Sequence, residues 1–169
     1  MRRGLQIAGV FAALLFGSDD PSILVMTPPI RGLVRSELRD MFHEQHNGHT
    51  HEAIDIMKPK GTPVFAVVSG TIKRLFLSKP GGNTIYEFDK DGIYCYYYAH
   101  LDSYAAGLHE GMHVDQGDLV GYVGSTGNAN ASAPHLHFAI FELGPDKIWW
   151  KGKAVDPLPP LIEAAKRAH

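Results

Sequence analysis

Three observations predict that this chain has a mainly β fold, built as a compact antiparallel sheet or sandwich. Apolar and β-branched residues occur in short runs, and 18 glycines and 11 prolines interrupt them along the 169 residues. Short strands with frequent turns are typical of antiparallel sandwiches and barrel-like sheets. A hydrophobic fraction of 44% over this length is sufficient for one domain with a buried core.

Residues 1–20 combine positive charge with an apolar run. Arg2 and Arg3 precede a run from Leu5 to Phe16, for which we expect a short helix. This order is typical of a secretory signal or a short membrane anchor. The run is shorter than the roughly 20 residues of a transmembrane helix, and an ordinary buried helix is the alternative. We therefore expect an exported protein, with residues 5–16 as its signal or anchor.

Turn residues and periodicity divide the rest of the chain. Residues 21–40 hold several prolines and little periodicity, so we expect a linker or an irregular arm. The compact domain is expected over 41–161, and a tail over 162–169 continues a helix predicted from Leu161 to Arg167. Asp89–Gly92 separates two strand-like runs and predicts a hairpin. The predicted strands are Thr62–Val68, Thr71–Leu77, Thr84–Phe88, Ile93–Ala99, Leu119–Val123 and His135–Phe141.

Histidine is the unusual feature of the composition, with ten residues, whereas Cys95 is the single cysteine. No disulfide within the chain and no cysteine metal cluster can form, so a metal site must use His, Asp or Glu. In a strand, His135 and His137 point to one face and Leu136 points to the other. We interpret the pair as a metal edge or an acid/base pair, with a solvent-facing polar strand as the alternative.

A second motif, His51-x-x-x-Asp55, separates two metal-binding residue types by four positions, which share a face in a helix and in a strand. It differs from the His-Glu-x-x-His motif of helical zinc proteases, because Asp55 stands where the second histidine would be. Together with either His135 or His137, it makes three N/O ligands and leaves a fourth position for water, as in catalytic zinc sites. His100, at the end of a predicted strand, is a candidate proton carrier, with a packed histidine as the alternative.

Three motifs in this order resemble the lysostaphin/LytM-type zinc metalloendopeptidases. They are His51-x-x-x-Asp55, Tyr98-Ala99-His100-Leu101 and His135-Leu136-His137-Phe138. The framing segments resemble that family as well, namely Pro59–Val64, Ser69–Thr71, Gly121–Asn128 and Val155–Pro157. The resemblance extends over roughly residues 42–161 and so covers most of the chain.

The resemblance implies a fold, a cofactor and a substrate. Members of the family are compact antiparallel β domains with a groove across one sheet, and they cut peptide cross-links or bridges of bacterial cell-wall peptidoglycan. Matched position by position, His51, Asp55 and His137 would bind Zn²⁺. His100 and His135 would activate water and stabilise the oxyanion. The implied location is the periplasm or cell envelope, with an anchor in the inner membrane as one possibility; the exact bond, the oligomeric state and regulation stay open.

Three other partners or functions agree less well with the sequence. The net charge of −2 and the lack of a basic stripe argue against nucleic acid as a partner. Some domains that resemble the same family have lost metal ligands and only bind and activate cell-wall amidases. This chain retains all five site residues. A barrel-sandwich carrier domain would need a modified lysine on an exposed hairpin, and Lys90 lacks the usual flanking residues.

Three further sets of residues lie outside the predicted metal site. The first set consists of three histidines close to the His51-x-x-x-Asp55 motif. We interpret them as loop residues, with a weak second metal site or competition for zinc as alternatives. The second set consists of three tyrosines that share one strand face, for which we favour sheet packing over an aromatic wall for the substrate. The third set is a pair of adjacent tryptophans, which we interpret as a packed corner, with a groove lip or a partner contact as alternatives. These sets are His43, His46 and His49; Tyr94, Tyr96 and Tyr98; and Trp149 and Trp150.

Overall fold

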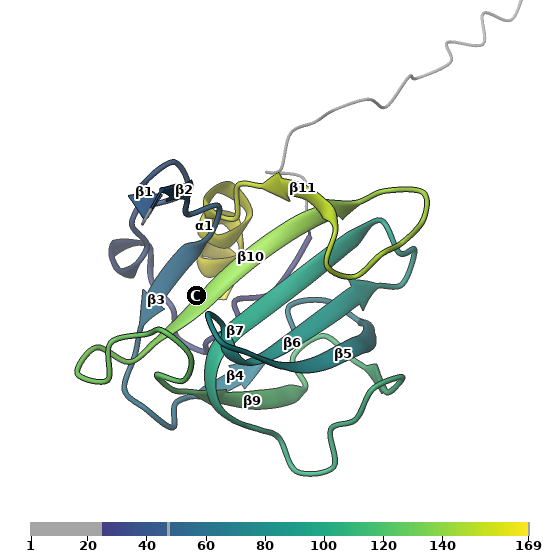
Figure 1. Cartoon of the computed structure of the whole chain (residues 1–169), viewed down its shortest axis with the longest axis horizontal. Helices are drawn as coiled ribbons and strands as arrows, with labels where there is room; N and C mark the ends of the chain where they lie inside the picture. The colour runs from purple at the N-terminus through teal and green to yellow at the C-terminus, as the bar shows by residue number, and fades with distance from the viewer. Residues whose placement is uncertain (1–24, 47, 169) are drawn as a thin grey trace, which may run out of the picture.

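The computed structural model describes residues 25–46 and 48–168 (Figure 1). The predicted signal or anchor helix over residues 5–16 lies outside the described residues. Within the described residues, no helix has the length and apolar character needed to cross a membrane.

The described residues form antiparallel β structure with one α-helix near the C-terminus, which confirms the predicted fold class (Figure 1). The large sheet has the order β11-β10-β7-β6-β5-β8; β3 pairs with β10, and β9 pairs with β7 and β4. Strands β1 and β2 form a separate ribbon. The elements are η2 Arg35–Glu37, β1 Gln45–His46, β2 His49–Thr50, β3 Ile54–Met57, β4 Pro63–Phe65, β5 Gly70–Ser78, β6 Gly82–Asp89, β7 Tyr94–Tyr104, β8 His113–Val114, β9 Leu119–Val123, β10 His135–Leu143, β11 Gly152–Val155 and α1 Leu158–Arg167.

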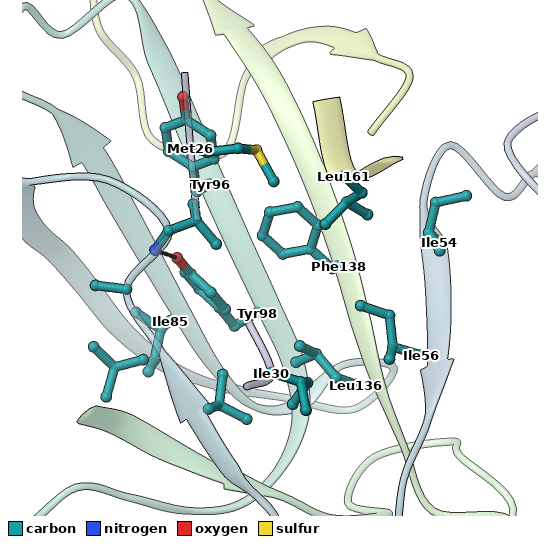
Figure 2. Close-up of a cluster of buried hydrophobic side chains, with 14 of the residues drawn as sticks. Met26, Ile30, Ile54, Ile56, Ile85, Tyr96, Tyr98, Leu136, Phe138 and Leu161 are labelled. Atoms are coloured by element: carbon teal, nitrogen blue, oxygen red, sulfur yellow. Dashed lines mark hydrogen bonds between the residues drawn. The ribbon is translucent and has the colours of Figure 1, made fainter. Parts of the chain in front are cut away.

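One face of the large sheet is covered by the hydrophobic core. In β10, Leu136, Phe138 and Ile140 alternate with the histidines and are fully buried. Each buried side chain of this size contributes about 1.5–3 kcal/mol relative to an exposed one. Figure 2 shows Phe138 beside Leu161 of α1, so the C-terminal helix packs against this face.

The tyrosines of β7 divide between the two faces of the sheet. Tyr96 and Tyr98 are buried in the core, and Tyr94 packs against it. Tyr98 accepts a hydrogen bond from the Val67 backbone N–H at 3.0 Å, as Figure 2 shows. The packing interpretation of these three tyrosines is therefore confirmed, and the tyrosine on the opposite face is Tyr97.

Several element boundaries differ from the predicted ones. The run predicted over Thr62–Val68 is a strand only at Pro63–Phe65, where its register with β9 shifts. Strand β7 continues through His100 to Tyr104, beyond the predicted end at Ala99. Helix α1 begins at Leu158, before the predicted start at Leu161. Prolines are tolerated in its first turn, because the N–H that proline lacks would have no partner within the helix there.

The segment predicted as a linker or arm over residues 21–40 is irregular in its described part, but it is packed against the domain. Met26, Ile30 and Leu33 are at most 2% exposed. Backbone hydrogen bonds join Thr27 N–H to the Val67 carbonyl and Phe65 N–H to the Pro29 carbonyl. The packed domain thus begins before residue 41, because apolar residues among the prolines are buried against β4 and the core.

Candidate metal centre

The five predicted site residues lie together on the sheet face opposite the core. In the antiparallel register, His137 of β10 stands between Asp55 of β3 and Ala99 of β7. His100 follows Ala99 directly in the chain. These residues open into a hollow of about 380 Å³, lined by His49, His51, Asp55, Pro80, Gly81, Tyr97, Ala99, His100, Asn128, Ala129, Asn130, His135 and His137. The predicted groove on one sheet face therefore contains all five residues.

His51 meets Asp55 by a different route from the predicted one. His51 precedes β3, and the intervening Glu52 has a φ of 54°, which is uncommon for a residue with a side chain. Backbone N–H groups of His51 and Glu52 donate to the carbonyls of Glu44 and Phe42 and hold this turn. The two candidate ligands therefore converge because the chain makes a left-handed turn between them. They do not lie on the shared face of one helix or strand, as the spacing had predicted.

Three atoms of these side chains form a nearly equilateral triangle. Asp55 Oδ1 lies 3.2 Å from His51 Nε2 and 3.1 Å from His137 Nδ1, and the two nitrogens lie 3.2 Å apart. Tetrahedral zinc with bonds of about 2.0–2.1 Å separates neighbouring ligand atoms by about 3.3 Å. Within the described residues, this trio is the group of His, Cys, Asp and Glu that could hold a metal ion. The residues present therefore fit a tetrahedral metal ion with one position left open.

The charges in the trio favour a bound cation. Burial alone would raise the pKa of Asp55, but hydrogen bonds from His137 and His51 hold it well below its usual range. The hydrogen bond with Asp55 raises the pKa of His51. Burial lowers the pKa of His137, against the opposing effect of Asp55. An ionised carboxylate beside a neutral imidazole is the donor set that a divalent ion requires.

His100 is held by its backbone and by a neighbouring loop. Its φ of 59° is unusual for a non-glycine residue, and such conformations cost about 1–3 kcal/mol. His100 Nδ1 lies 2.8 Å from the Thr126 carbonyl oxygen, which only accepts, so Nδ1 carries the proton. Burial lowers the pKa of His100 to about 4. The neutral ring therefore presents the unprotonated Nε2 to the hollow.

The loop that orients His100 depends on two glycines. A Cβ on Gly127 would lie 2.3 Å from the Pro80 carbonyl oxygen, and one on Gly82 would lie 2.1 Å from Thr126 Oγ1. Both glycines also have positive φ values, 76° and 64°. Their lack of side chains lets the loop after β9 contact the start of β6, which keeps the Thr126 carbonyl at His100.

His135 is oriented in the same way as His100. Its Nδ1 lies 2.9 Å from the Ala133 carbonyl oxygen, so Nδ1 donates and Nε2 faces the hollow. His135 Nε2 lies 3.8 Å from Asp55 Oδ1, and the ring centroids of His100 and His135 are 4.9 Å apart. Two imidazoles with matching tautomers thus flank the metal trio.

Two features of the hollow were not predicted. Tyr97 lines it, with its ring 6.0 Å from that of His137, because Tyr97 and Ala99 share the strand face that meets His137. The alternation of β7 could have indicated this, had the facing strand been known. His46 and His49, which were interpreted as loop residues, belong instead to strands β1 and β2, and His49 also lines the hollow, although it lies outside the metal trio.

The chain resembles known proteins over the same region. Residues 49–157 match peptidase family M23. Lysostaphin of Staphylococcus simulans is 40% identical over 93 residues, covering 54% of this chain and 18% of that protein. The L-Ala--D-Glu endopeptidase of Bacillus subtilis is 32% identical over 116 residues, covering 66% of this chain and 34% of that protein.

The fold comparison agrees with these matches. The catalytic domain of lysostaphin from Staphylococcus simulans superposes with a TM-score of 0.58 and 32% identity, covering 82% of this chain and 89% of that domain. The chain spans less than two thirds of the full length of the curated relatives named above. The matched residues include the whole metal trio and both flanking histidines. This chain belongs to peptidase family M23.

Proposed function

We propose that the domain is a Zn²⁺-dependent endopeptidase that hydrolyses peptide cross-links or bridges of bacterial cell-wall peptidoglycan. The observation that carries the proposal is the His51, Asp55 and His137 triangle, with spacings of 3.1–3.2 Å, beside two oriented histidines in an open hollow. Two relatives, a glycyl-glycine endopeptidase of Staphylococcus capitis and an L-Ala--D-Glu endopeptidase of Bacillus subtilis, support the hydrolysis of peptide bonds.

The five residues divide the chemistry between them. His51, Asp55 and His137 would hold the ion, which supplies Lewis-acid polarisation of a peptide carbonyl and a water nucleophile near neutral pH. His100, neutral with its Nε2 unprotonated, is suited to accept a proton from the attacking water. His135 Nε2 also faces the hollow, and once this nitrogen carries a proton the ring would donate a hydrogen bond to the oxyanion or pass that proton to the leaving amine.

The hollow leaves the cleaved bond open between two classes. The curated relatives carry names for a bond between glycines and for a bond between L-alanine and D-glutamate. Both are bonds between small or acidic residues, which suit a hollow lined by histidines, asparagines and small side chains. Digestion of peptidoglycans with different cross-links, followed by mass analysis of the fragments, identifies the bond.

The decisive experiment combines metal analysis with digestion of sacculi. The zinc-loaded protein is expected to bind one ion and to release soluble fragments, and His137→Ala to do neither. The matched control is His113→Ala, since His113 is exposed on β8 and outside the hollow. Equal activity of His137→Ala would refute the enzyme proposal, whereas zinc binding without any hydrolysis would favour a binding and amidase-activating domain.

We also infer export to the periplasm or cell envelope, with residues 5–16 as the signal or anchor. Support comes from Arg2 and Arg3 ahead of the apolar run and from the cell-wall substrate proposed above. Fractionation of cells that produce the full chain, with and without residues 2–16, tests this inference. Equal distribution of both forms in the cytosol would contradict it.

A further inference from the structure

A second hollow lies beside the metal hollow and is lined almost entirely by aromatic rings. It has a volume of about 250 Å³, and its lining residues are Tyr86, Tyr97, Phe141, Trp149, Trp150 and Gly152. None of the six carries a charge. The metal hollow, in contrast, is lined by histidines, an aspartate and asparagines.

The two hollows share one lining residue, Tyr97. The ring of Tyr97 lies 6.0 Å from that of His137 on one side and 4.7 Å from that of Tyr86 on the other. A Cβ on Gly81, which lines the metal hollow, would lie 2.4 Å from the Tyr97 hydroxyl oxygen. Tyr97 is therefore the side chain at which the metal hollow and the aromatic hollow adjoin.

The two tryptophans of the aromatic hollow differ in their packing and in their exposure to solvent. Trp149 packs edge-on against Tyr86, with 4.6 Å between ring centroids, and against Trp150 at 5.0 Å. Trp150, however, is 66% exposed. The interpretation of the pair as a packed corner thus describes Trp149, whereas Trp150 presents a free aromatic face. Large exposed aromatic groups beside a cleft are typical of binding surfaces.

We propose that the aromatic hollow is a subsite for an N-acetylated sugar ring of the glycan strand to which the substrate peptide is attached. This inference rests on the proposed function. Cell-wall peptides offer small and charged side chains but no aromatic ones, so the flat apolar faces in such a substrate are those of its sugar rings. A pyranose places its C–H bonds on an aromatic face and its hydroxyl groups toward Tyr and Trp hydrogen-bond donors. The hollow is close to the lower end of ligand-pocket volumes and so suits one ring.

The distance between the hollows agrees with this substrate. Phe141 follows His137 by four residues along β10, which corresponds to about 13 Å at the rise of an antiparallel strand. An extended peptide covers that distance with about four residues. A peptide that joins a sugar to a cross-link a few residues away therefore reaches from the aromatic hollow to the metal.

The first test measures sugar binding directly and does not require catalysis. Trp149 and Trp150 are the only tryptophans of the chain, so its tryptophan fluorescence reports on the aromatic hollow alone. Titration of the full chain with the disaccharide of N-acetylglucosamine is expected to give a saturable change. Trp150→Ala should weaken the affinity about tenfold. Leu77→Ala, which removes another exposed apolar side chain from β5 outside the hollow, should leave it unchanged.

The second test compares two substrates that differ only in the sugar. A cross-linked peptide carrying the disaccharide should have a kcat/KM about tenfold above that of the same peptide without it, and Trp150→Ala should abolish this preference. Trp150→Phe should restore part of it. No saturable fluorescence change, or equal effects of Trp150→Ala on both substrates, would overturn the inference. If neither substrate is cleaved, the proposed enzyme function fails while the fluorescence titration still decides the sugar subsite.

Discussion

The two faces of the large sheet each bury a carboxylate, and the two have opposite properties. On the core face, burial raises the pKa of Glu87 to about 8, and its hydrogen bond is the one from the Tyr98 hydroxyl at 2.5 Å. On the groove face, two imidazoles hold the pKa of Asp55 well below its usual range, although burial acts in the other direction.

The difference shows that burial keeps a carboxyl group neutral unless its hydrogen-bonding partners outweigh the cost of burial. At Glu87 the hydrogen bond from the Tyr98 hydroxyl lowers the pKa but is outweighed by burial, whereas at Asp55 the two imidazoles together outweigh burial. Glu87 can therefore stay protonated inside the fold near neutral pH, while Asp55 provides the negative charge that a cation requires. Glu87 on β6 and Asp55 on β3 belong to the same sheet, with β7 and β10 between them.

The largest expected effect comes from removing the charge on the groove face. Asp55→Asn keeps the shape of the side chain but removes the anion, so the zinc should be lost and, with it, all measurable activity. Metal analysis and sacculus digestion measure both results. Zinc should raise the melting temperature of the wild-type chain and leave that of Asp55→Asn unchanged, because only a bound ligand stabilises the native state. Retention of a full zinc complement in the variant would contradict the assigned trio.

A smaller loss is expected when the groove face keeps its metal but loses a proton carrier. His100→Ala should retain zinc and the wild-type fold, with kcat reduced by about 10²–10⁴-fold, the usual contribution of general acid–base catalysis. Zinc stoichiometry and circular dichroism are the controls for an intact site. Wild-type kcat in this variant would show that His100 is a packed residue, which was the alternative from the sequence.

On the core face, Glu87→Gln should change how stability depends on pH. The folded pKa of about 8 lies above the unfolded value near 4.5, so between these values the native state holds a proton that the unfolded state has lost. The free energy of unfolding of the wild-type chain should therefore decrease as pH rises through this window, by roughly 2–4 kcal/mol. Glu87→Gln should remove this decrease. Urea unfolding at pH 5, 6.5 and 8 measures it, and parallel pH profiles for both chains would refute a protonated Glu87.

The smallest effect is expected from the partner of that carboxyl. Tyr98→Phe keeps the ring in the core but leaves the Val67 N–H and Glu87 without the hydroxyl that contacts both. The free energy of unfolding should decrease by about 1–3 kcal/mol. Catalysis should persist, because Tyr98 points away from the metal hollow. A loss of activity without a loss of stability would show that the two faces are coupled.

Much of the architecture could be predicted from local patterns. The alternation in His135-Leu136-His137 determines that both histidines leave the core when the segment is a strand, and β10 has this arrangement. Strand ends were predicted less well where the cause is not local. β7 continues through His100 because β9 pairs with Leu101 and Tyr104 beyond it.

The site shows the same division between local and long-range causes. The types and order of its residues, and the choice of metal that they permit, were readable from the chain, because ligand chemistry belongs to the side chains themselves. The sequence did not indicate three other features of the site. These are the left-handed turn at Glu52, the register that sets Asp55 opposite His137, and the carbonyls that orient His100 and His135. These depend on contacts between segments up to 86 residues apart, such as His51 and His137. Likewise Tyr97 lines both hollows only because β6, β7 and β10 lie side by side, and strand neighbours are decided by packing over the whole core.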